Sequence, residues 1–488
     1  MKKIILGLSV LAAALLAVSA AWTGATRGRW GNFEDYMCRE TAKPFFLSVH
    51  ADGGALVTQG RKGARPFSFS MPKPAGVKRV FVIGESAAEL LARGGRDSFE
   101  ETFRSAAGTP VEIINCGMGA YDSSRIYGVF TEALAYAPDL IILLSGNNEI
   151  GPEMEACPGP SGFFRAVPRW LRALFFSAGR SWREGLRREA DRAHAARLEK
   201  MAALAGRRGV GFMLCTLPYN PAFPPYGPMP LEDEDFAAAL ALLERGEMSG
   251  AQARLLAFVS KKPGNTFGLY YLGLAAAKAG DAGQAGDFYE RALASDHRSD
   301  RAGAARNSYI RGSAARTGSC LGDLEAALGG RLPAPLADGV HWHKRYDREA
   351  ALEILRGLAA CPAAQDLRLR GTPPPPEERS PAERREALRE ESRAMLNYAA
   401  AYLLFPAGEP PYLNSRALYQ LEGACARDKE FIGAALASES SLAEALTDNM
   451  WVGELRAGAK TLLPLLRRHA EGPCARGARL YAGGTDRS

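Results

Sequence analysis

Residues 77–86 read VKRVFVIGES, and this stretch decides the fold. The run over 77–83, which is apolar from Val80 to Ile83, predicts a buried strand that ends in Gly84, and residues 87–93 have a helical pattern. The same rhythm continues along the chain, with strands expected at 111–114, 140–144 and 210–217 and helices at 123–136 and 183–206. Continuous apolar strands separated by helices are typical of a parallel sheet covered on both faces. The sequence therefore predicts the α/β class, as a three-layer α/β/α sandwich.

Four short segments lie at the carboxyl ends of expected strands, where doubly wound sheets bind their ligands. They are VIGES (82–86), INCGMGA (114–120), LLSGNNE (143–149) and DGVH (338–341). Ser86 begins a helix, which exposes its hydroxyl and leaves its backbone amide free. The second segment is a turn of small residues whose amides can face a ligand. Together these segments predict a functional site at one edge of the sheet.

In this order and at these elements, the four segments resemble the blocks of the SGNH (GDSL-like) hydrolases. That family has a GDS-type serine, a Gly-containing turn after the second strand, a GxND segment and a late DxxH motif. The resemblance covers residues 77–152, 210–217 and 335–358. It implies a flavodoxin-like parallel sheet and a serine ester hydrolase or acyltransferase without a metal or other cofactor.

The resemblance assigns a role to each matching residue. Ser86 would be the nucleophile, His341 its base and Asp338 the residue that orients the imidazole. The oxyanion would be bound by the Ser86 amide, the Asn148 side chain and one further amide, from Ala120 or from Gly119. Losing one such donor typically costs ~2.7–4 kcal/mol of barrier.

The sequence departs from the family at two carboxylates, and it leaves some alternatives open. Glu85 and Glu149 stand where the family has Asp, and Glu149 is either structural or a substrate contact. Ser86 alone would also suit a helix N-cap. His343 is an alternative base, and His341 with His343 is an alternative metal pair, although no third ligand follows at a suitable spacing.

A segment that repeats at an interval of 34 residues interrupts the α/β pattern. Gly246 matches Gly280 and Ala251 matches Ala285. The second copy has the spacings of a tetratricopeptide repeat, in which small residues let two helices pack closely. We expect such an insertion at 229–330, dividing the hydrolase domain into residues 76–228 and 331–362. An unrelated helical hairpin with a coincidental period is the alternative.

The remaining segments are predicted from composition. Residues 28–75 are a short β-rich lead-in, with a hairpin indicated around Asp52-Gly53-Gly54. Residues 363–384 form a Pro-rich linker, and residues 385–488 form a helical extension without a chemical motif.

The N-terminus predicts export. Lys2 and Lys3 precede an uncharged run over 4–22, which is either a signal peptide or a membrane anchor. The predicted location is therefore periplasmic or elsewhere in the cell envelope, or secreted. A net charge of +7, from 61 Lys and Arg against 54 Asp and Glu, is small for 488 residues and argues against nucleic-acid binding.

The eight cysteines include no CxxC pair, which argues against zinc and redox motifs. Cys116 and Cys215 lie in strand-like runs and are expected to be reduced core residues. The other six can pair in an oxidising compartment, and Cys425 with Cys474 is the preferred pair.

These observations predict an exported SGNH-type esterase or O-acyltransferase that acts on an acyl ester, with an O-acylated glycan as a substrate suggested by the family. The competing hypothesis is a scaffold that binds proteins through its tetratricopeptide-like helices and carries a weakly active or silent hydrolase fold.

Overall fold

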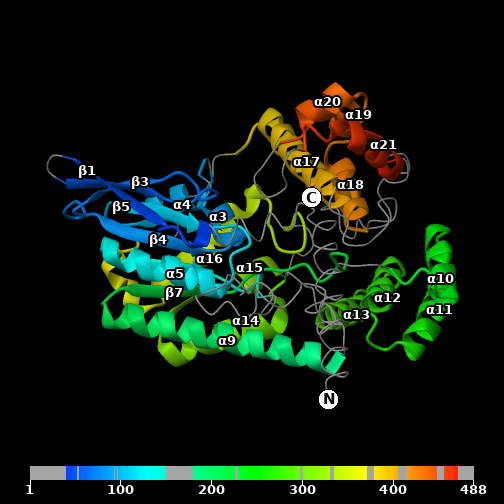
Figure 1. Cartoon of the computed structure of the whole chain (residues 1–488), viewed down its shortest axis with the longest axis horizontal. Coiled ribbons are helices and arrows are strands. Elements are labelled where there is room, and N and C mark those ends of the chain that lie inside the picture. Colours follow the sequence, from blue (N-terminus) through cyan, green and yellow to red (C-terminus); the bar gives the residue numbers. More distant parts are fainter. Residues whose placement is uncertain are drawn as a thin grey trace, which may run out of the picture.

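The computed structural model describes residues 40–470, except 52–53, 93, 96, 150–179, 226–228, 297–300, 330–334, 371–377, 405–414 and 448–454. The α/β domain lies at one end of the molecule, and two helical groups lie at the other end (Figure 1). The predicted signal or anchor segment falls outside the described residues. Within those residues, no helix combines the length and apolar character needed to cross a membrane.

Among the described residues, the central sheet has five strands, all parallel. They are β4 (Lys78–Gly84), β5 (Val111–Gly117), β6 (Leu140–Leu144), β7 (Gly211–Cys215) and β8 (Cys320–Gly322), in the spatial order β5-β4-β6-β7-β8. Numbered along the chain within this sheet, the order is 2-1-3-4-5, the doubly wound order of flavodoxin-like folds. The predicted parallel α/β architecture is confirmed.

Both faces of the sheet are apolar, which explains the uninterrupted runs in the sequence. Successive side chains of a strand point to opposite faces, so Val80 and Val82 enter one core while Phe81 and Ile83 enter the other. The first core is covered by α3 (Ser86–Leu91), α4 (Phe99–Ala106), α15 (Leu324–Gly329) and α16 (Asp347–Ala359). The second is covered by α5 (Ser123–Ala133), α9 (Arg180–Arg207) and α14 (Gly303–Thr317).

The lead-in is a small antiparallel sheet of β1 (Phe46–Ala51), β2 (Gly54–Gln59) and β3 (Ser68–Met71). The hairpin predicted at residues 52–54 is confirmed by the pairing of β1 with β2. Phe46 and Phe69 join the second core of the main sheet, so the lead-in is packed onto the α/β domain.

Four helices follow β7: α10 (Glu234–Glu244), α11 (Met248–Lys261), α12 (Thr266–Lys278) and α13 (Ala282–Ser295). α13 lies 34 residues after α11 at both ends, which is the interval of the sequence repeat. A Cβ on Gly273 would lie 2.7 Å from the ring of Tyr289, so the small residue allows α12 and α13 to approach closely. Their assignment as tetratricopeptide repeats stays a prediction.

The predicted boundary of this insertion, residue 330, is wrong. β8 pairs with β7 inside the sheet, and α14 packs against α9, so the chain has returned to the α/β domain by α14. β8 has only three residues and contains a glycine, which is too short a run for sequence periodicity to identify.

The C-terminal extension is helical, as expected, and begins at Pro381 rather than residue 385. It contains α17 (Pro381–Leu404), α18 (Ser415–Arg427), α19 (Lys429–Ala435), α20 (Glu439–Ala445) and α21 (Ala459–Ala470). These helices enclose a core of their own, with Leu396, Leu421 and Leu462 fully buried. In Figure 1 α17 lies between the α/β domain and the other helices of the extension.

Candidate active site

Ser86 lies at the carboxyl end of β4, in the first turn of α3. Gly84 allows the chain to pass closely between its neighbours there: a Cβ would lie 2.0 Å from the carbonyl oxygen of Leu144 on β6 and 2.9 Å from the Cβ of Ala88 on α3. The N-cap residue of α3 is Glu85, and no side chain caps the helix. The Ser86 hydroxyl is instead hydrogen-bonded to a residue far away in the sequence. The alternative prediction, that Ser86 is the N-cap of the helix, is therefore wrong.

That partner is His341. The His341 Nε2 atom lies 2.7 Å from Ser86 Oγ, across 255 positions of sequence. On the other side of the ring, Nδ1 lies 2.7 Å from Asp338 Oδ2. The structure thus joins the serine, the histidine and the aspartate in one continuous line of hydrogen bonds at the edge of the sheet.

Asp338 and His341 are held by the turn that contains them. Asp338 Oδ1 accepts the backbone amides of Val340 and His341, at 2.8 and 2.7 Å. The turn closes through the amide of Ala337, which donates to the carbonyl of His341. It is anchored by Trp342, which is fully buried and is therefore fixed in the core.

The electrostatics of this line suit an imidazole base. Burial alone would raise the pKa of Asp338, but the charge of His341 and hydrogen bonds from its ring, its amide and the Val340 amide outweigh burial and lower that pKa. Asp338 therefore stays a carboxylate that accepts the Nδ1 proton of His341. A neutral ring in this tautomer directs the lone pair of Nε2 toward the hydroxyl of Ser86.

Two backbone amides at the site are free to bind an oxyanion. Neither the Ser86 amide nor the Ala120 amide donates to another described residue. Gly119 differs, because its amide faces the Glu89 carboxylate: burial, the larger effect, raises the pKa of that group, and the Gly119 amide acts to lower it. Ala120 adopts a left-handed conformation with φ of 58°. The structure therefore favours Ala120 over Gly119 as the second amide donor.

Asn148 lies at the same edge of the sheet, and its side-chain amide is already hydrogen-bonded within the protein. Its Nδ2 donates to Glu85 Oε2 at 3.2 Å and to the carbonyl of Tyr121 at 3.3 Å. Binding an oxyanion would exchange one of these long bonds for a bond to the substrate. In the resting structure, Asn148 therefore lies beside the site with both of these hydrogen bonds formed.

The two carboxylates that depart from the family pattern are buried supports. Glu85 accepts the backbone amides of Asn147 and Asn148, and Glu149 accepts the amide and hydroxyl of Ser123. Burial raises the pKa of each to about 7; the negative charge of Glu149 adds to the effect on Glu85, whereas Arg306 opposes the effect on Glu149. Glu149 is thus held in a structural contact.

Arg306 of α14 supports the loop after β6, a role that the sequence did not suggest. Its guanidinium donates to the carbonyls of Gly146 and Glu149 and pairs with Asp191 of α9 at 2.7 Å. Arg306 was assigned to the helical insertion, so no local pattern connected it with this loop.

His343 has a different environment from His341. Its Nε2 lies 2.9 Å from Arg427, and its Nδ1 lies 3.5 Å from Glu391. The ring is nearly fully buried between the α/β domain and the C-terminal extension. It therefore belongs to an interdomain network, and the structure gives it no contact with Ser86.

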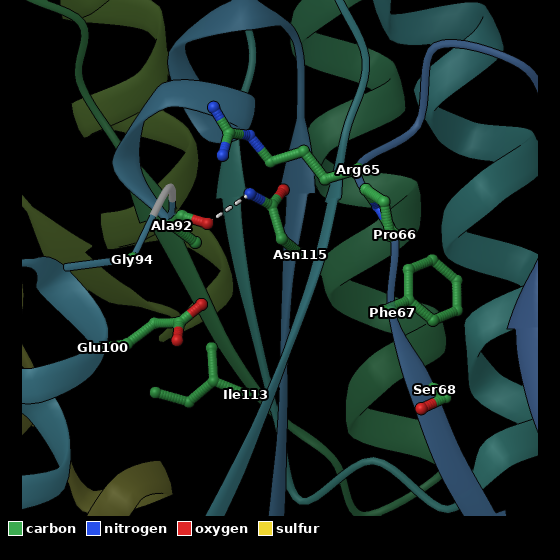
Figure 2. Close-up of a pocket in the computed structure, with 9 residues that line it drawn as sticks. All are labelled: Arg65, Pro66, Phe67, Ser68, Ala92, Gly94, Glu100, Ile113 and Asn115. Atoms are coloured by element: carbon green, nitrogen blue, oxygen red, sulfur yellow. Dashed lines mark hydrogen bonds between the residues drawn. The ribbon is translucent and has the colours of Figure 1, made fainter.

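A cavity of about 320 Å³ lies beside β5, the edge strand of the sheet. Figure 2 shows Asn115 between the lead-in segment with Arg65 on one side and the segment with Glu100 on the other. Asn115 donates to the carbonyls of Glu89 and Ala92. Glu89 is one turn after Ser86, so the cavity lies beside the helix that carries the serine.

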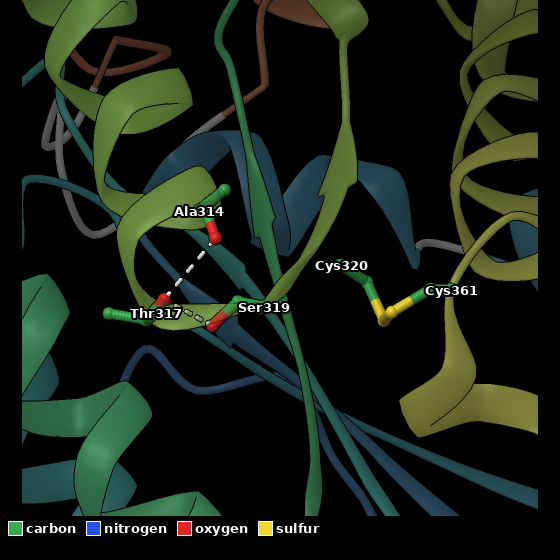
Figure 3. Close-up of a disulfide and its surroundings, with 5 residues drawn as sticks. All are labelled: Ala314, Thr317, Ser319, Cys320 and Cys361. Atoms are coloured by element: carbon green, nitrogen blue, oxygen red, sulfur yellow. Dashed lines mark hydrogen bonds between the residues drawn. A yellow bond between two sulfur atoms is a disulfide. The ribbon is translucent and has the colours of Figure 1, made fainter.

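A disulfide closes the chain segment that contains Asp338 and His341. Cys320 on β8 is bonded to Cys361 after α16 (Figure 3). Cys116 and Cys215 are buried and reduced, as predicted. Cys425 is also disulfide-bonded, and its predicted partner, Cys474, lies outside the described residues.

A serine–histidine–aspartate arrangement at the edge of a doubly wound sheet defines the site. No family model and no curated protein matches the chain. Among solved structures it is similar to an acetyl xylan esterase, with 13% identity, 57% of this chain and 98% of that chain covered, and a TM-score of 0.29. It is also similar to a GDSL-like lipase from Bacteroides thetaiotaomicron (12%, 58% and 89%, TM-score 0.28) and to an acetylxylan esterase from Geobacillus stearothermophilus (14%, 57% and 93%, TM-score 0.30). These TM-scores are too low to assign a function, which we therefore infer from the geometry.

Proposed function

We propose that this chain is a serine ester hydrolase or O-acyltransferase of the SGNH type, acting through an acyl-enzyme on Ser86. The observation that carries the proposal is the line of two 2.7 Å hydrogen bonds from Ser86 through His341 to Asp338. Nucleophile, base and orienting carboxylate are all within the range expected of a functional triad.

In the first half of the reaction, Ser86 Oγ attacks the ester carbonyl carbon while its proton passes to His341 Nε2. The resulting oxyanion is bound by the Ser86 and Ala120 amides and by Asn148, once Asn148 releases one of its resting partners. Collapse breaks the bond to the alcohol, which leaves with the proton from Nε2. The acyl group is then esterified to Ser86.

In the second half, an acceptor hydroxyl gives its proton to Nε2 and attacks the acyl carbon. Collapse restores the Ser86 hydroxyl, which recovers the proton from His341. Water as acceptor releases the acid, whereas a sugar hydroxyl would give a new ester. The proposed substrate is an acyl ester, and an O-acylated glycan of the cell envelope is the class that the family resemblance and the predicted export suggest.

A protein-binding scaffold is the competing function, suggested by the repeat spacing of α10–α13. Against it stands the intact hydrogen-bonded line, which a scaffold has no need to maintain. The two hypotheses differ in one respect that is simple to measure, the reactivity of Ser86.

Turnover of p-nitrophenyl acetate and labelling by a fluorophosphonate test the proposal. We expect both with the wild-type protein and neither with Ser86→Ala. Ser98→Ala is a matched control, because Ser98 also begins a helix but caps α4 by accepting the amide of Glu101. It should lose ~1 kcal/mol of stability and keep its activity. Equal, background rates for wild type and Ser86→Ala would support the scaffold instead.

A further inference from the structure

The C-terminal extension reaches the proposed triad through Tyr398 of α17. The Tyr398 ring lies parallel to the imidazole of His341, with 9° between the planes and 6.0 Å between the centroids. Its hydroxyl oxygen lies 3.4 Å from His341 Nδ1. This distance between centroids is within the range of an offset stack of rings.

The hydrogen bonds of His341 to Asp338 and Ser86 act at the edges of its ring. Asp338 and Ser86 bind Nδ1 and Nε2 in the plane of the imidazole, and such bonds fix the two nitrogen positions. They do not prevent the ring from tilting about the line that joins its partners. A side chain against the face of the ring restrains that tilt.

We propose that Tyr398 is a positioning residue for His341, acting through the face of its ring. This inference rests on the proposed function, since it concerns the base of that reaction. The aromatic ring carries the effect, and the hydroxyl adds little, because 3.4 Å is long for a hydrogen bond. The extension is then a part of the active site rather than an appendage to it.

The attachment of α17 fits this role. Glu391 lies seven residues before Tyr398, on the same face of the helix. Its carboxylate pairs with Arg427 at 3.0 Å and with Arg345 at 3.2 Å. Arg427 also contacts His343, two residues beyond the proposed base. The helix that carries Tyr398 is therefore fastened to the segment that carries His341.

Three variants of the full chain test the inference. Tyr398→Leu removes the ring, and Tyr398→Phe removes only the hydroxyl. Tyr402→Leu is the matched control, since Tyr402 lies one turn further along α17 and its ring packs near Phe223 instead. The measurements are kcat and KM for p-nitrophenyl acetate, the rate of fluorophosphonate labelling and the thermal midpoint.

We expect Tyr398→Leu to lower kcat and the labelling rate by about 3- to 10-fold at unchanged KM. Tyr398→Phe should recover most of that loss, and Tyr402→Leu should keep kcat even if its thermal midpoint falls as far. The inference is overturned if Phe is as slow as Leu, if the control is equally slow, or if only KM changes, since Tyr398 would then act on the substrate.

A readout without turnover separates this inference from the proposed function. In the wild type, the Nδ1 proton between His341 and Asp338 should give a downfield NMR resonance. We expect that resonance to broaden or disappear in Tyr398→Leu and to remain in Tyr402→Leu. An inactive, unlabelled wild type would refute the proposed function. A resonance unchanged in Tyr398→Leu would refute the positioning role.

Discussion

Replacing Asp338 by asparagine should remove the base from Ser86 while leaving the fold intact. Asp338 Oδ1 accepts two backbone amides, from Val340 and His341, whereas among the described residues Oδ2 accepts only from the imidazole. An asparagine can satisfy those two amides only with its carbonyl oxygen. Its NH2 group must then face His341 Nδ1, at the position that Oδ2 holds 2.7 Å away.

This orientation reverses the tautomer of the imidazole. Nδ1 has to accept the hydrogen bond from the amide, so the ring proton moves to Nε2, opposite Ser86 Oγ. A protonated Nε2 cannot take the serine proton, and the loss expected for a wrong tautomer is about 10⁴ in kcat, or ~5.4 kcal/mol of barrier. The two backbone hydrogen bonds survive, so we expect little change in the free energy of unfolding.

The assay compares kcat for p-nitrophenyl acetate and the thermal midpoint of wild type, Asp338→Asn and Asp347→Asn. Asp347 is a matched control, because it is buried in the same segment and accepts a hydrogen bond from Trp342. It should keep most of the activity. Asp338→Asn activity above about a tenth of wild type would refute the tautomer reasoning, as would an equal loss in the control.

Four further predictions follow from the site and its supports. Asn148→Ala should lower kcat by about 10²–10³ through the loss of an oxyanion donor, and an unchanged kcat would remove Asn148 from the mechanism. Ala120→Gly should keep kcat, because the donor is an amide, and should match or exceed wild-type stability by up to ~1 kcal/mol in urea unfolding, since φ of 58° strains alanine. Burial raises the pKa of Glu149 from 4.5 to about 7, so between these values the folded state binds a proton that the unfolded chain releases. The free energy of unfolding should therefore fall as pH rises through this window, by at most ~3 kcal/mol for this group. Glu149→Gln should flatten the pH dependence of the thermal midpoint between pH 4.5 and 7, and an unchanged slope would contradict the assignment. Replacing Cys320 and Cys361 together by serine should lower the free energy of unfolding by ~3–4 kcal/mol, because the disulfide closes a loop of 41 positions. Activity at 25 °C should persist in the folded fraction, and a complete loss of activity in folded protein would contradict a purely stabilising role.

The architecture could be predicted because the strands are buried on both faces. In β4, neighbouring residues Val82 and Ile83 enter opposite cores, which leaves an uninterrupted apolar run in the sequence. The hairpin of the lead-in was equally readable, since its turn residues lie between two strand-like runs. β8 was missed because three residues that include a glycine form no such run.

The residues of the candidate site could be predicted from sequence motifs. The four motifs predicted a site made of Ser86, Asn148, Asp338 and His341. The structure brings all four residues to one edge of the sheet. Their catalytic roles stay a proposal. The choice of Ala120 over Gly119 needed coordinates, since adjacent amides of a turn look alike in sequence and differ only in where they point.

By itself, the sequence determined those strands and helices whose burial leaves a periodic trace in their own residues, and it identified the candidate site residues by their motifs. The tertiary structure alone decided which distant segments support them. Arg306 contacts the loop after β6 from α14, and Tyr398 covers His341 from the C-terminal extension. Such contacts depend on how separate elements pack around the finished sheet, and the spacing of residues along either element carries no record of them.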